Sequence, residues 1–518
     1  MRRCLSLLVF AVLGNGCESN HAPDPKGFGF ASLVPLPMSV VRAPGAFRIA
    51  ASTTIYVDAA SPELEAIGRT LADKLNAATG YNIGVAASAG LPGDGNIQLT
   101  TSDANPSLGE EGYSLTVTTT SVSIRAANPV GVFRGIQTVL QLLPAEIETT
   151  TAQDTPWLIS AGTITDRPRF GWRGMMLDVA RHFFTVPDVK TLIDTMAFYK
   201  LNRLHLHLSD DQGWRIAIKA FPTLAMIGGL TSVGGGPGGY FSQAEYSDIV
   251  SYARQRYITV VPELEMPGHT SAALASIPDL NCDGNAPPLY TGTAVGFSSL
   301  CTSKESSYSF AEKVLMELAA LTPGPYLHIG GDEAQGTPVA DYIKFIERVQ
   351  PMVKALGKQL VGWEEVAQAH LLPTSIAQHW LQSTLTKAAV QQGTKIVMSA
   401  ASKMYMDMKY DTSTVVGQSW AGLIDVKTAY SWDPASHVSG ISETDILGVE
   451  APLWTETIRS INDVQQMTFP RLIGYAEIGW SPQASRDWND YRVRLANQGR
   501  RLTARNVQFY HSPQIDWQ

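Results

Sequence analysis

The stretch YLHIGGDEA, residues 326–334, joins a short apolar run to two adjacent acids. Seven other short apolar runs lead into charged or aromatic residues: WRGMMLDVA (172–180), LNRLHLHLS (201–209), YITVVPELE (257–265), QLVGWEE (359–365), SIAQHW (375–380), KIVMSA (395–400) and GVEAPLW (448–454). Helical stretches and loops separate these eight runs. Short apolar runs can also be buried helix, but this alternation favours an α/β fold, a (β/α)8 TIM barrel over residues 167–518.

The segment 34–166 has a different pattern and predicts a small α+β domain before the barrel. Residues 53–59 and 112–127 alternate apolar and polar side chains as strands do, the second as a hairpin. Residues 61–80 predict a helix that begins at Ser61 and ends at Gly80, and residues 129–143 predict a second helix. The segment contains no catalytic constellation, so we expect it to support the barrel.

The N-terminus predicts export. Residues 1–17 combine two arginines, an apolar run and small residues, which is typical of a signal peptide, and residues 18–33 read as a polar linker. Cys17 follows Gly-Asn-Gly, loosely like a lipoprotein cleavage site, so it is a candidate for lipidation; plain cleavage nearby is the alternative. We expect a periplasmic, secreted or lipid-anchored protein.

Two of the four cysteines, Cys282 and Cys301, lie in the body of the chain. An even pair in an exported protein favours a disulfide, with two free thiols as the alternative. Composition excludes other classes: the formal net charge is -8 with no basic patch, so we expect no nucleic-acid partner. No internal stretch is long and apolar enough to predict a transmembrane span.

The residues that follow the strands should meet at one end of the barrel, where barrel enzymes place their active sites. They are Arg181, Asp210, Glu265, His269, Asp332, Glu333, Trp363, Trp380, Tyr405, Asp407, Trp454 and Glu456. Aromatic faces stack on sugar C–H groups, while arginine and carboxylates bind hydroxyls. This combination predicts a carbohydrate site.

The adjacent acids Asp332 and Glu333 indicate how the sugar is cleaved. Retaining glycosidases usually place two carboxyl groups about 5–5.5 Å apart across the sugar, which neighbouring residues cannot easily do. We therefore expect Glu333 to act as general acid and Asp332 to steer a nucleophile supplied by the substrate, such as a 2-acetamido group. Tryptophans would enclose the acetamido methyl.

The chain resembles glycoside hydrolase family 20, the β-N-acetylhexosaminidases, over about residues 35–510. The resemblance is carried by WRGMMLDVARHFF, LHLHLSDDQGWR, PELEMPGHTSAAL, HIGGDE, GWEE, YMDMKY and LWTET, in that order. It implies an exo-acting retaining hydrolase that removes terminal β-linked N-acetylglucosamine or N-acetylgalactosamine through an oxazolinium intermediate, without cofactor or metal. The substrates would be β-N-acetylhexosaminide oligosaccharides or glycoconjugates, as in chitin or glycan degradation.

The resemblance also implies roles for individual residues. Glu333 corresponds to the acid/base, Asp332 to the residue that orients the acetamido N–H, and Tyr405 to the hydroxyl on the acetamido oxygen. Asp210 and His269 correspond to a polar chain beside the acid. The substrate-binding positions are Trp363, Trp380 and Trp454 around the acetamido group, Arg181, Asp407 and Glu456 on hydroxyls, and Trp420 at the rim. Cys282 and Cys301 correspond to a disulfide of bacterial members.

Two other functions stay open. A sugar-binding barrel without catalysis would use the same aromatic residues, although Glu333 is present. A metal-dependent hydrolase would use His205 and His207, which share one strand face, with His328 as a further ligand. Satisfied interior histidines are the more common arrangement. Gluco or galacto preference, the natural glycan and the oligomeric state do not follow from the sequence.

Overall fold

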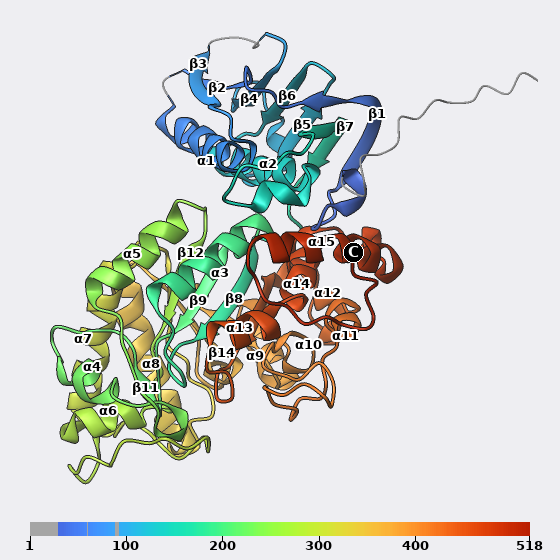
Figure 1. Cartoon of the computed structure of the whole chain (residues 1–518). Coiled ribbons are helices and arrows are strands. Elements are labelled where there is room, and N and C mark those ends of the chain that lie inside the picture. Colours follow the sequence, from blue (N-terminus) through green and yellow to red (C-terminus); the bar gives the residue numbers. More distant parts are fainter. Residues whose placement is uncertain (1–28, 60, 89–92) are drawn as a thin grey trace, which may run out of the picture.

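The structure is a computed structural model that describes residues 29–59, 61–88 and 93–518. It has two lobes, a small N-terminal domain stacked on a larger barrel (Figure 1). The predicted signal peptide 1–17, Cys17 and most of the predicted linker lie outside the described residues. The end of that linker is packed, because Phe30, Ser32 and Leu33 are buried. The last residues of the segment predicted as linker are therefore part of the folded domain.

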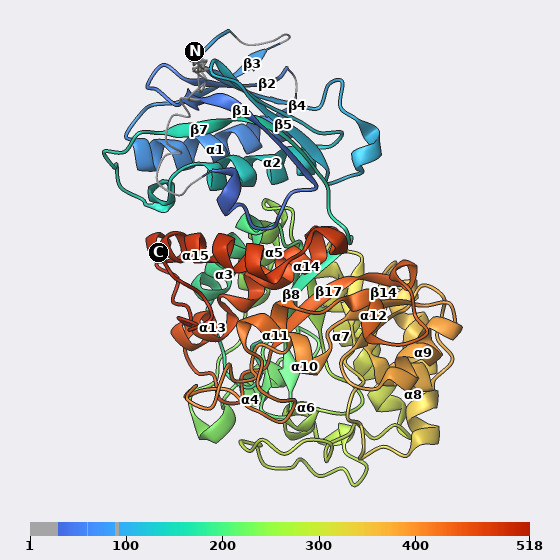
Figure 2. The same cartoon turned by 90° about the vertical axis from the view of Figure 1, so that its right-hand side faces the viewer.

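The N-terminal domain is a seven-stranded mixed sheet in the order β1-β7-β5-β6-β4-β2-β3. Its strands are β1 (Ser39–Arg48), β2 (Thr54–Asp58), β3 (Gly84–Ser88), β4 (Asn96–Thr100), β5 (Tyr113–Val117), β6 (Ser121–Arg125) and β7 (Leu158–Asp166). Helices α1 (Pro62–Thr79) and α2 (Pro129–Leu142) lie along one side of this sheet (Figure 2). The predicted hairpin is confirmed as β5 and β6, which pair antiparallel.

Helix α1 shows why the local sequence predicted its ends. The Ser61 hydroxyl accepts a hydrogen bond from the N–H of Leu64 at 3.3 Å, which satisfies one of the free donors of the first turn. Gly80 ends the helix in the left-handed region, at φ 71°. Leu64, Ile67, Leu71 and Leu75 are all buried, so the apolar stripe faces the sheet.

The barrel is closed by eight strands in the order β12-β13-β14-β15-β16-β17-β8-β9. They are β8 (Trp172–Asp178), β9 (Arg203–His207), β12 (Thr259–Glu263), β13 (Tyr326–His328), β14 (Gln359–Trp363), β15 (Ile376–His379), β16 (Lys395–Met398) and β17 (Ile446–Leu453). All neighbouring pairs are parallel. Seven strands lie within the apolar runs and β17 begins two residues before its run, so the predicted TIM barrel is confirmed.

Helices cover the outside of the barrel and the loops above it. They are α3 (Val186–Phe198), α4 (Thr223–Gly228), α5 (Gln243–Arg254), α6 (Ser271–Ser276), α7 (Glu305–Leu321), α8 (Val339–Ala355), α9 (Ser383–Gln391), α10 (Ala401–Met404), α11 (Val426–Tyr430), α12 (Pro434–His437), α13 (Ile461–Thr468), α14 (Arg471–Trp480) and α15 (Trp488–Ala504). Two very short strands, β10 (Ser209–Asp210) and β11 (Gly213–Trp214), follow β9. Between β14 and β15 the described chain forms a 3-10 helix, η6 (Glu364–Gln368), in place of an α-helix.

The small domain packs against the end of the barrel at which the strands begin. Glu111, which precedes β5, accepts hydrogen bonds from Arg173 at the start of β8 and from Asn202 just before β9. Lys200 binds the Asp166 carboxylate at 3.0 Å across the same boundary. The strands therefore end on the side away from the small domain, which leaves the opposite mouth of the barrel to the site.

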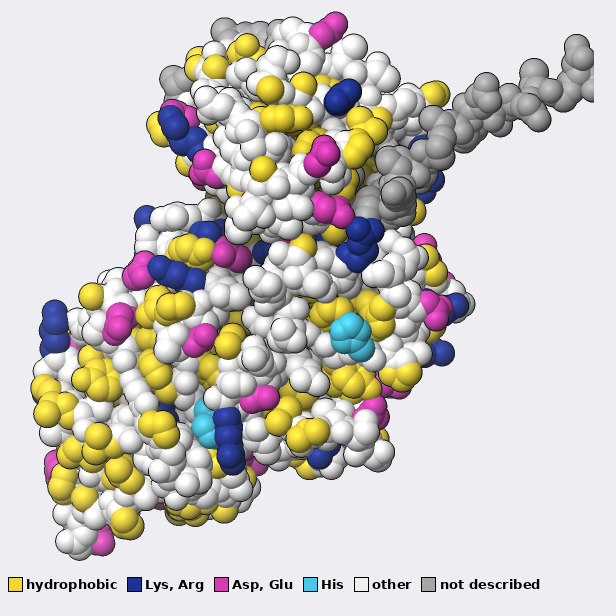
Figure 3. Space-filling model, in the orientation of Figure 1, with side chains coloured by type: hydrophobic (Ala, Val, Ile, Leu, Met, Phe, Trp, Pro, Cys, Tyr) yellow, Lys and Arg dark blue, Asp and Glu magenta, His cyan; other side chains and the backbone are white. Residues whose placement is uncertain are grey.

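Side chains of both charge signs are interspersed over the described part of the face shown in Figure 3. Within the described residues, no helix is both long and apolar enough to cross a membrane.

Candidate active site

The turn after β13 places the two adjacent acids. Asp332 and Glu333 lie beyond the end of the strand, so the alternation of strand side chains does not separate them. Gly330 and Gly331 have φ values of 65° and 94°, and Glu333 itself has φ 46°. A Cβ atom on Gly330 would lie 1.8 Å from the Glu265 Oε2 atom, so the close approach of that buried carboxylate requires glycine there. A left-handed glutamate is a strained conformation of the kind that clusters at active sites.

Both acids face one histidine. His269 Nε2 lies 3.4 Å from Glu333 Oε2 and 3.6 Å from Asp332 Oδ2. On its other side, His269 Nδ1 lies 3.2 Å from Asp210 Oδ1, and Asp210 Oδ2 lies 2.8 Å from Arg181 Nη2. The four loops after β8, β9, β12 and β13 thus converge on a single chain of charged groups.

Burial and charge shift the proton affinities of this chain. Burial of His269 disfavours the imidazolium, but the Asp210 carboxylate outweighs this effect and holds the pKa of His269 well above its usual value. Burial favours protonation of Asp210, but Arg181 and His269 hold its pKa well below the usual value. Burial raises the pKa of Asp332 from 3.8 to about 6, with a further contribution from the Glu333 carboxylate and partial opposition from His269. Asp210 and Asp332 therefore have opposite pKa shifts although both are buried, and perturbed carboxyl groups of this kind cluster at functional sites.

Five aromatic side chains, one from the end of β14 and four from the loops after β15, β16 and β17, form one cluster beside the acids. Ring centroids are 5.7 Å apart for Trp363–Trp454, 6.2 Å for Tyr405–Trp454 and 6.4 Å for the parallel pair Trp380–Tyr405. Trp420 meets Trp380 and Tyr405 edge-on at 6.1 and 5.9 Å. Trp420 is 50% exposed, whereas Trp363 and Tyr405 are buried, so Trp420 lies at the outer edge of the cluster.

Two further acids have oxygens without a protein partner among the described residues. Neither Asp407 oxygen has a hydrogen-bond partner, although the residue is 1% exposed, and Glu456 Oε2 is also unpaired. Burial, and then the neighbouring Glu456 carboxylate, raise the pKa of Asp407 well above its ordinary value. Buried acceptors normally have donors, so this pair is suited to a ligand with several hydroxyl groups. Arg181 lies over the Trp454 ring at 4.9 Å and completes this side.

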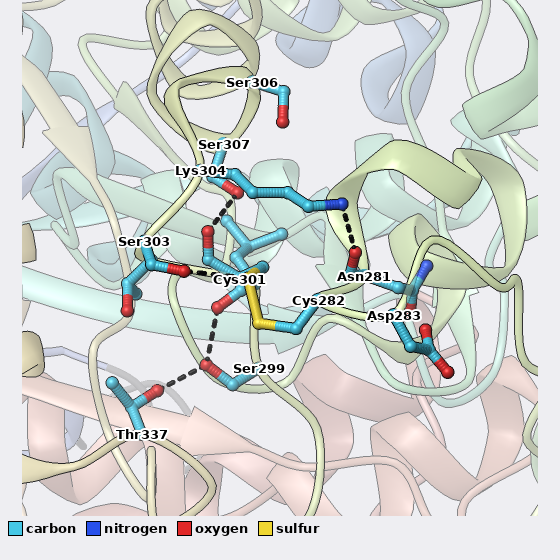
Figure 4. The surroundings of a disulfide bond; sticks show 12 residues. Asn281, Cys282, Asp283, Ser299, Cys301, Ser303, Lys304, Ser306, Ser307 and Thr337 are labelled. Atoms are coloured by element: carbon cyan, nitrogen blue, oxygen red, sulfur yellow. Dashed lines mark hydrogen bonds between the residues drawn. A yellow bond between two sulfur atoms is a disulfide. The ribbon is translucent and has the colours of Figure 1, made fainter.

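The predicted disulfide Cys282–Cys301 is present, and Figure 4 shows its surroundings. The segment that it closes hydrogen-bonds to the segment of His269: Leu300 N donates to Pro267 O at 2.9 Å, and Thr270 N donates to Ser298 Oγ at 2.9 Å. The bond therefore holds the loop that supports the histidine, without touching the acids.

Comparisons with known proteins agree with this geometry. The family model of the glycosyl hydrolase family 20 catalytic domain matches residues 170–342 and 336–483. The model of domain 2 of the same family matches residues 31–167. The chain belongs to glycosyl hydrolase family 20. A β-N-acetylhexosaminidase from Cellulomonas fimi is 38% identical over 94% of this chain and 97% of its own.

Solved family 20 structures have the same fold. The β-N-acetylhexosaminidase of Streptomyces coelicolor A3(2) is 48% identical with a TM-score of 0.91, covering 94% of this chain and 99% of its own. A Streptomyces plicatus N-acetyl-β-hexosaminidase in complex with Thio-NAglucal is 50% identical with the same TM-score of 0.91, covering 94% of this chain and 98% of its own.

Several acids that hold the family 20 site were not predicted from the sequence. Asp178 accepts N–H groups from Ala180 at 2.8 Å, Arg181 at 3.0 Å and Thr455 at 3.0 Å, and so ties the loops after β8 and β17 together. Its other contact is with Arg181 Nη1 at 3.3 Å. The position of Asp178 at the end of an apolar run was the available signal.

The two acids of the GWEE motif fix an aromatic wall. Glu364 accepts backbone N–H groups from Trp380, Leu381 and Gln382, and Glu365 accepts the indole N–H of Trp380 at 3.1 Å. A carboxylate that accepts three consecutive backbone donors fixes the loop that carries Trp380. These acids directly follow Trp363, so their place in the motif could have indicated a supporting role.

The interior histidines lie against carboxylates. His205 Nδ1 is 2.7 Å from Glu450 Oε1, and His205 Nε2 is 3.0 Å from Glu263 Oε2. His207 lies between Glu263 and Asp210, at 2.9 Å from the latter. The ligand atoms of His205, Glu263 and His328 lie within 4.8 Å of one another, a spacing that a metal ion could use, but all three are fully buried. His207 has a carboxylate at each ring nitrogen, whereas Nε2 of His205 and Nε2 of His328 have no hydrogen-bond partner among the described residues.

Proposed function

We propose that this chain is an exo-acting, retaining β-N-acetylhexosaminidase that works by substrate-assisted catalysis. The observation that carries the proposal is that Asp332 and Glu333 leave one turn and flank the same atom, His269 Nε2, at 3.6 and 3.4 Å. Carboxylates on one side of a site are not arranged as a nucleophile and an acid on opposite faces of a sugar. The substrate's own acetamido oxygen is then the nucleophile.

In the first step, Glu333 donates its proton to the glycosidic oxygen while the acetamido oxygen bonds to C1 and the leaving group departs. The nitrogen gains positive charge as the oxazolinium ring forms, and Asp332 accepts its N–H and stabilises that charge. Tyr405 donates its hydroxyl hydrogen to the acetamido oxygen. In the second step, Glu333 takes a proton from water, which attacks C1 and reopens the ring. Two inversions retain the β configuration.

The remaining residues bind the sugar. The Trp363, Trp380 and Trp454 rings enclose the acetamido group, because its methyl group needs an apolar surface and these rings supply one. Asp407, Glu456 and Arg181 bind the hydroxyls of the non-reducing end, and the unpaired oxygens of the two acids supply acceptors for them. Support comes from a mutant Streptomyces plicatus β-hexosaminidase, 49% identical to this chain, whose structure contains its product GlcNAc.

The test is release of nitrophenol from 4-nitrophenyl N-acetyl-β-glucosaminide and its galacto epimer, with the matching β-glucoside as control. Turnover of both N-acetyl substrates with an almost inert glucoside is expected. A glucoside rate close to that of the N-acetyl substrates would point to an enzyme carboxylate as nucleophile. No turnover of any of the three would favour a sugar-binding barrel, and loss of turnover on adding a chelator would favour a metal-dependent hydrolase.

We also propose that the protein is exported and acts on chitin fragments or other N-acetylhexosamine-containing glycans, either free or held by a lipid on Cys17. The signal-like sequence of residues 1–17 and the Cys282–Cys301 bond support export. Mass spectrometry of the mature N-terminus tests both parts. A diacylglyceryl mass on Cys17 would establish the anchor, cleavage nearby without it would establish plain secretion, and an unprocessed cytoplasmic chain would contradict export.

A further inference from the structure

Glu263, the last residue of β12, lies at the centre of a fully buried polar cluster beneath the site. Its Oε1 atom accepts the indole N–H of Trp363 at 2.9 Å and lies 2.8 Å from His328 Nδ1. Its Oε2 atom accepts a short hydrogen bond from His207 Nδ1 and lies 3.0 Å from His205 Nε2. Strands β9 and β14 thus each donate a hydrogen bond to this carboxylate, while His328 Nδ1, which accepts the N–H of Gly330 at 3.0 Å, lies beside it.

One side of this cluster leads to the general acid. His207 Nε2 lies 2.9 Å from Asp210 Oδ2, Asp210 Oδ1 lies 3.2 Å from His269 Nδ1, and His269 Nε2 lies 3.4 Å from Glu333 Oε2. Carboxylates and histidines alternate along the whole path from Glu263 to Glu333. The orientation of each ring is set by the carboxylates on either side of it.

The charges along this path are mutually compensating. Burial disfavours a charged His207, but Glu263 and Asp210 outweigh it and raise the pKa of His207 to about 10. Burial likewise opposes ionisation of Glu263, but His328, His207 and His205 hold its pKa well below the usual value. Removing either carboxylate would leave the buried charge of His207 less well compensated and would remove one of the hydrogen bonds to its ring.

The other side of the cluster leads to the acetamido pocket. Trp363 is 1% exposed, and its ring centroid lies 5.7 Å from that of Trp454. The hydrogen bond from its indole nitrogen to Glu263 fixes the plane of the ring. His207, on the acid side, also meets the Trp454 ring edge-on at 4.9 Å.

We propose that Glu263 is a positioning residue that aligns both halves of the reaction. Through His207 it holds the Asp210–His269–Glu333 chain, and through the indole N–H it holds the Trp363 wall of the acetamido pocket. It does not touch the substrate. The inference rests on the proposed function, because it takes Glu333 as the acid and Trp363 as a pocket wall.

The variant Glu263→Gln tests this, since it keeps the size of the side chain but removes the charge and turns an NH2 donor toward either His207 or Trp363, which both donate to the carboxylate. We expect kcat to fall by about 10- to 100-fold, the usual effect of removing hydrogen-bonded outer partners of site residues. The loss should be larger on chitobiose than on the 4-nitrophenyl substrate, because a poor leaving group depends more on a well-placed acid. The preference for N-acetyl over N-propionyl substrates should also fall, because the single amide oxygen cannot take the place of both carboxylate oxygens, which accept from His207 and from the Trp363 indole.

His205→Gln is the matched control. His205 also lies 3.0 Å from Glu263 Oε2 and 6.3 Å, ring to ring, from Trp363, but among the described residues no hydrogen bond joins it to Asp210 or to the Trp363 indole nitrogen. Its leaving-group dependence and acyl preference should stay within about twofold of wild type, since neither contact path is broken. Equal changes of both ratios in the two variants, or unchanged ratios in Glu263→Gln, would reduce Glu263 to a stabilising role in the barrel and overturn the proposal.

If thermal unfolding shows that Glu263→Gln is not folded, His207→Asn takes its place. It breaks the path to the acid and the edge-on contact with Trp454 but leaves the Glu263–Trp363 hydrogen bond intact, so leaving-group dependence should rise while acyl preference stays closer to wild type. An unchanged leaving-group dependence would overturn the proposal. A wild-type protein that fails to hydrolyse the N-acetyl substrate would instead refute the proposed function, which separates the two failures.

Discussion

Replacing Asp332 with asparagine removes the negative charge that we propose stabilises the developing oxazolinium ion, with almost no change in side-chain size. In the site, the pKa of Asp332 is raised from 3.8 to about 6, so ionising this carboxyl costs about 3 kcal/mol more than in water. A positive nitrogen beside the carboxylate relieves that cost as the transition state forms. Losing the relief corresponds to about a 100-fold fall in kcat, and an acetamido group that turns away from C1 would add to it.

The assay compares kcat and KM on the 4-nitrophenyl substrate with the inhibition constant of a thiazoline mimic of the oxazolinium ion. We expect a large fall in kcat, a small change in KM and a greater loss of affinity for the mimic than for the substrate, because the interaction strengthens mainly in the transition state. Asp332→Glu restores the charge but not the position and serves as the geometric control. A kcat near wild type in Asp332→Asn, or equal weakening of substrate and mimic, would refute the reasoning.

Three further predictions follow from the same geometry. Glu333→Gln removes the transferable proton, so kcat should fall by about 10²- to 10⁴-fold, more on chitobiose than on the nitrophenyl substrate; equal losses on both would count against the acid role. Because Asp332 must be ionised and its pKa is about 6, kcat/KM should decline as the pH drops below about 6, and a profile flat to pH 4 would contradict this. Thiol titration of the native mature protein should detect no free thiol at Cys282 or Cys301. Replacing both cysteines with serine should lower the free energy of unfolding by about 3 kcal/mol in denaturant titrations, because the bond closes a loop with a sequence separation of 19. The same replacement should change kcat little, because the bond does not touch the acids.

The fold was predictable because each barrel strand is a short apolar run bounded by helices or loops, and burial on both faces of a parallel sheet requires such runs. The 3-10 helix η6 after β14 was not predictable. It is fixed by hydrogen bonds between Glu364 and the loop that carries Trp380, a long-range contact that the local sequence does not show. The burial of Phe30 and Leu33 was also not predictable, because it depends on residues far away in the sequence and the local composition is typical of a linker.

The members of the site could be named because parallel strands bring their ends to one mouth of the barrel. The structure adds two features that the spacing of residues along the sequence does not show. The left-handed turn at Glu333 explains how adjacent acids reach the same histidine, and the approach of Glu265 explains the first glycine of the motif. Buried acids such as Asp178 and Glu263 were missed because their roles are contacts between strands far apart in the sequence.

Fluorinating the acetamido group of the substrate tests whether that group is the nucleophile. Measured on 4-nitrophenyl glucosaminides carrying N-acetyl, N-fluoroacetyl and N-trifluoroacetyl groups, kcat/KM should fall steeply with each step, because fluorine withdraws electrons from the attacking carbonyl oxygen. A kcat/KM independent of fluorination, together with a glycosyl adduct on an enzyme carboxylate in the mass spectrum, would contradict the account.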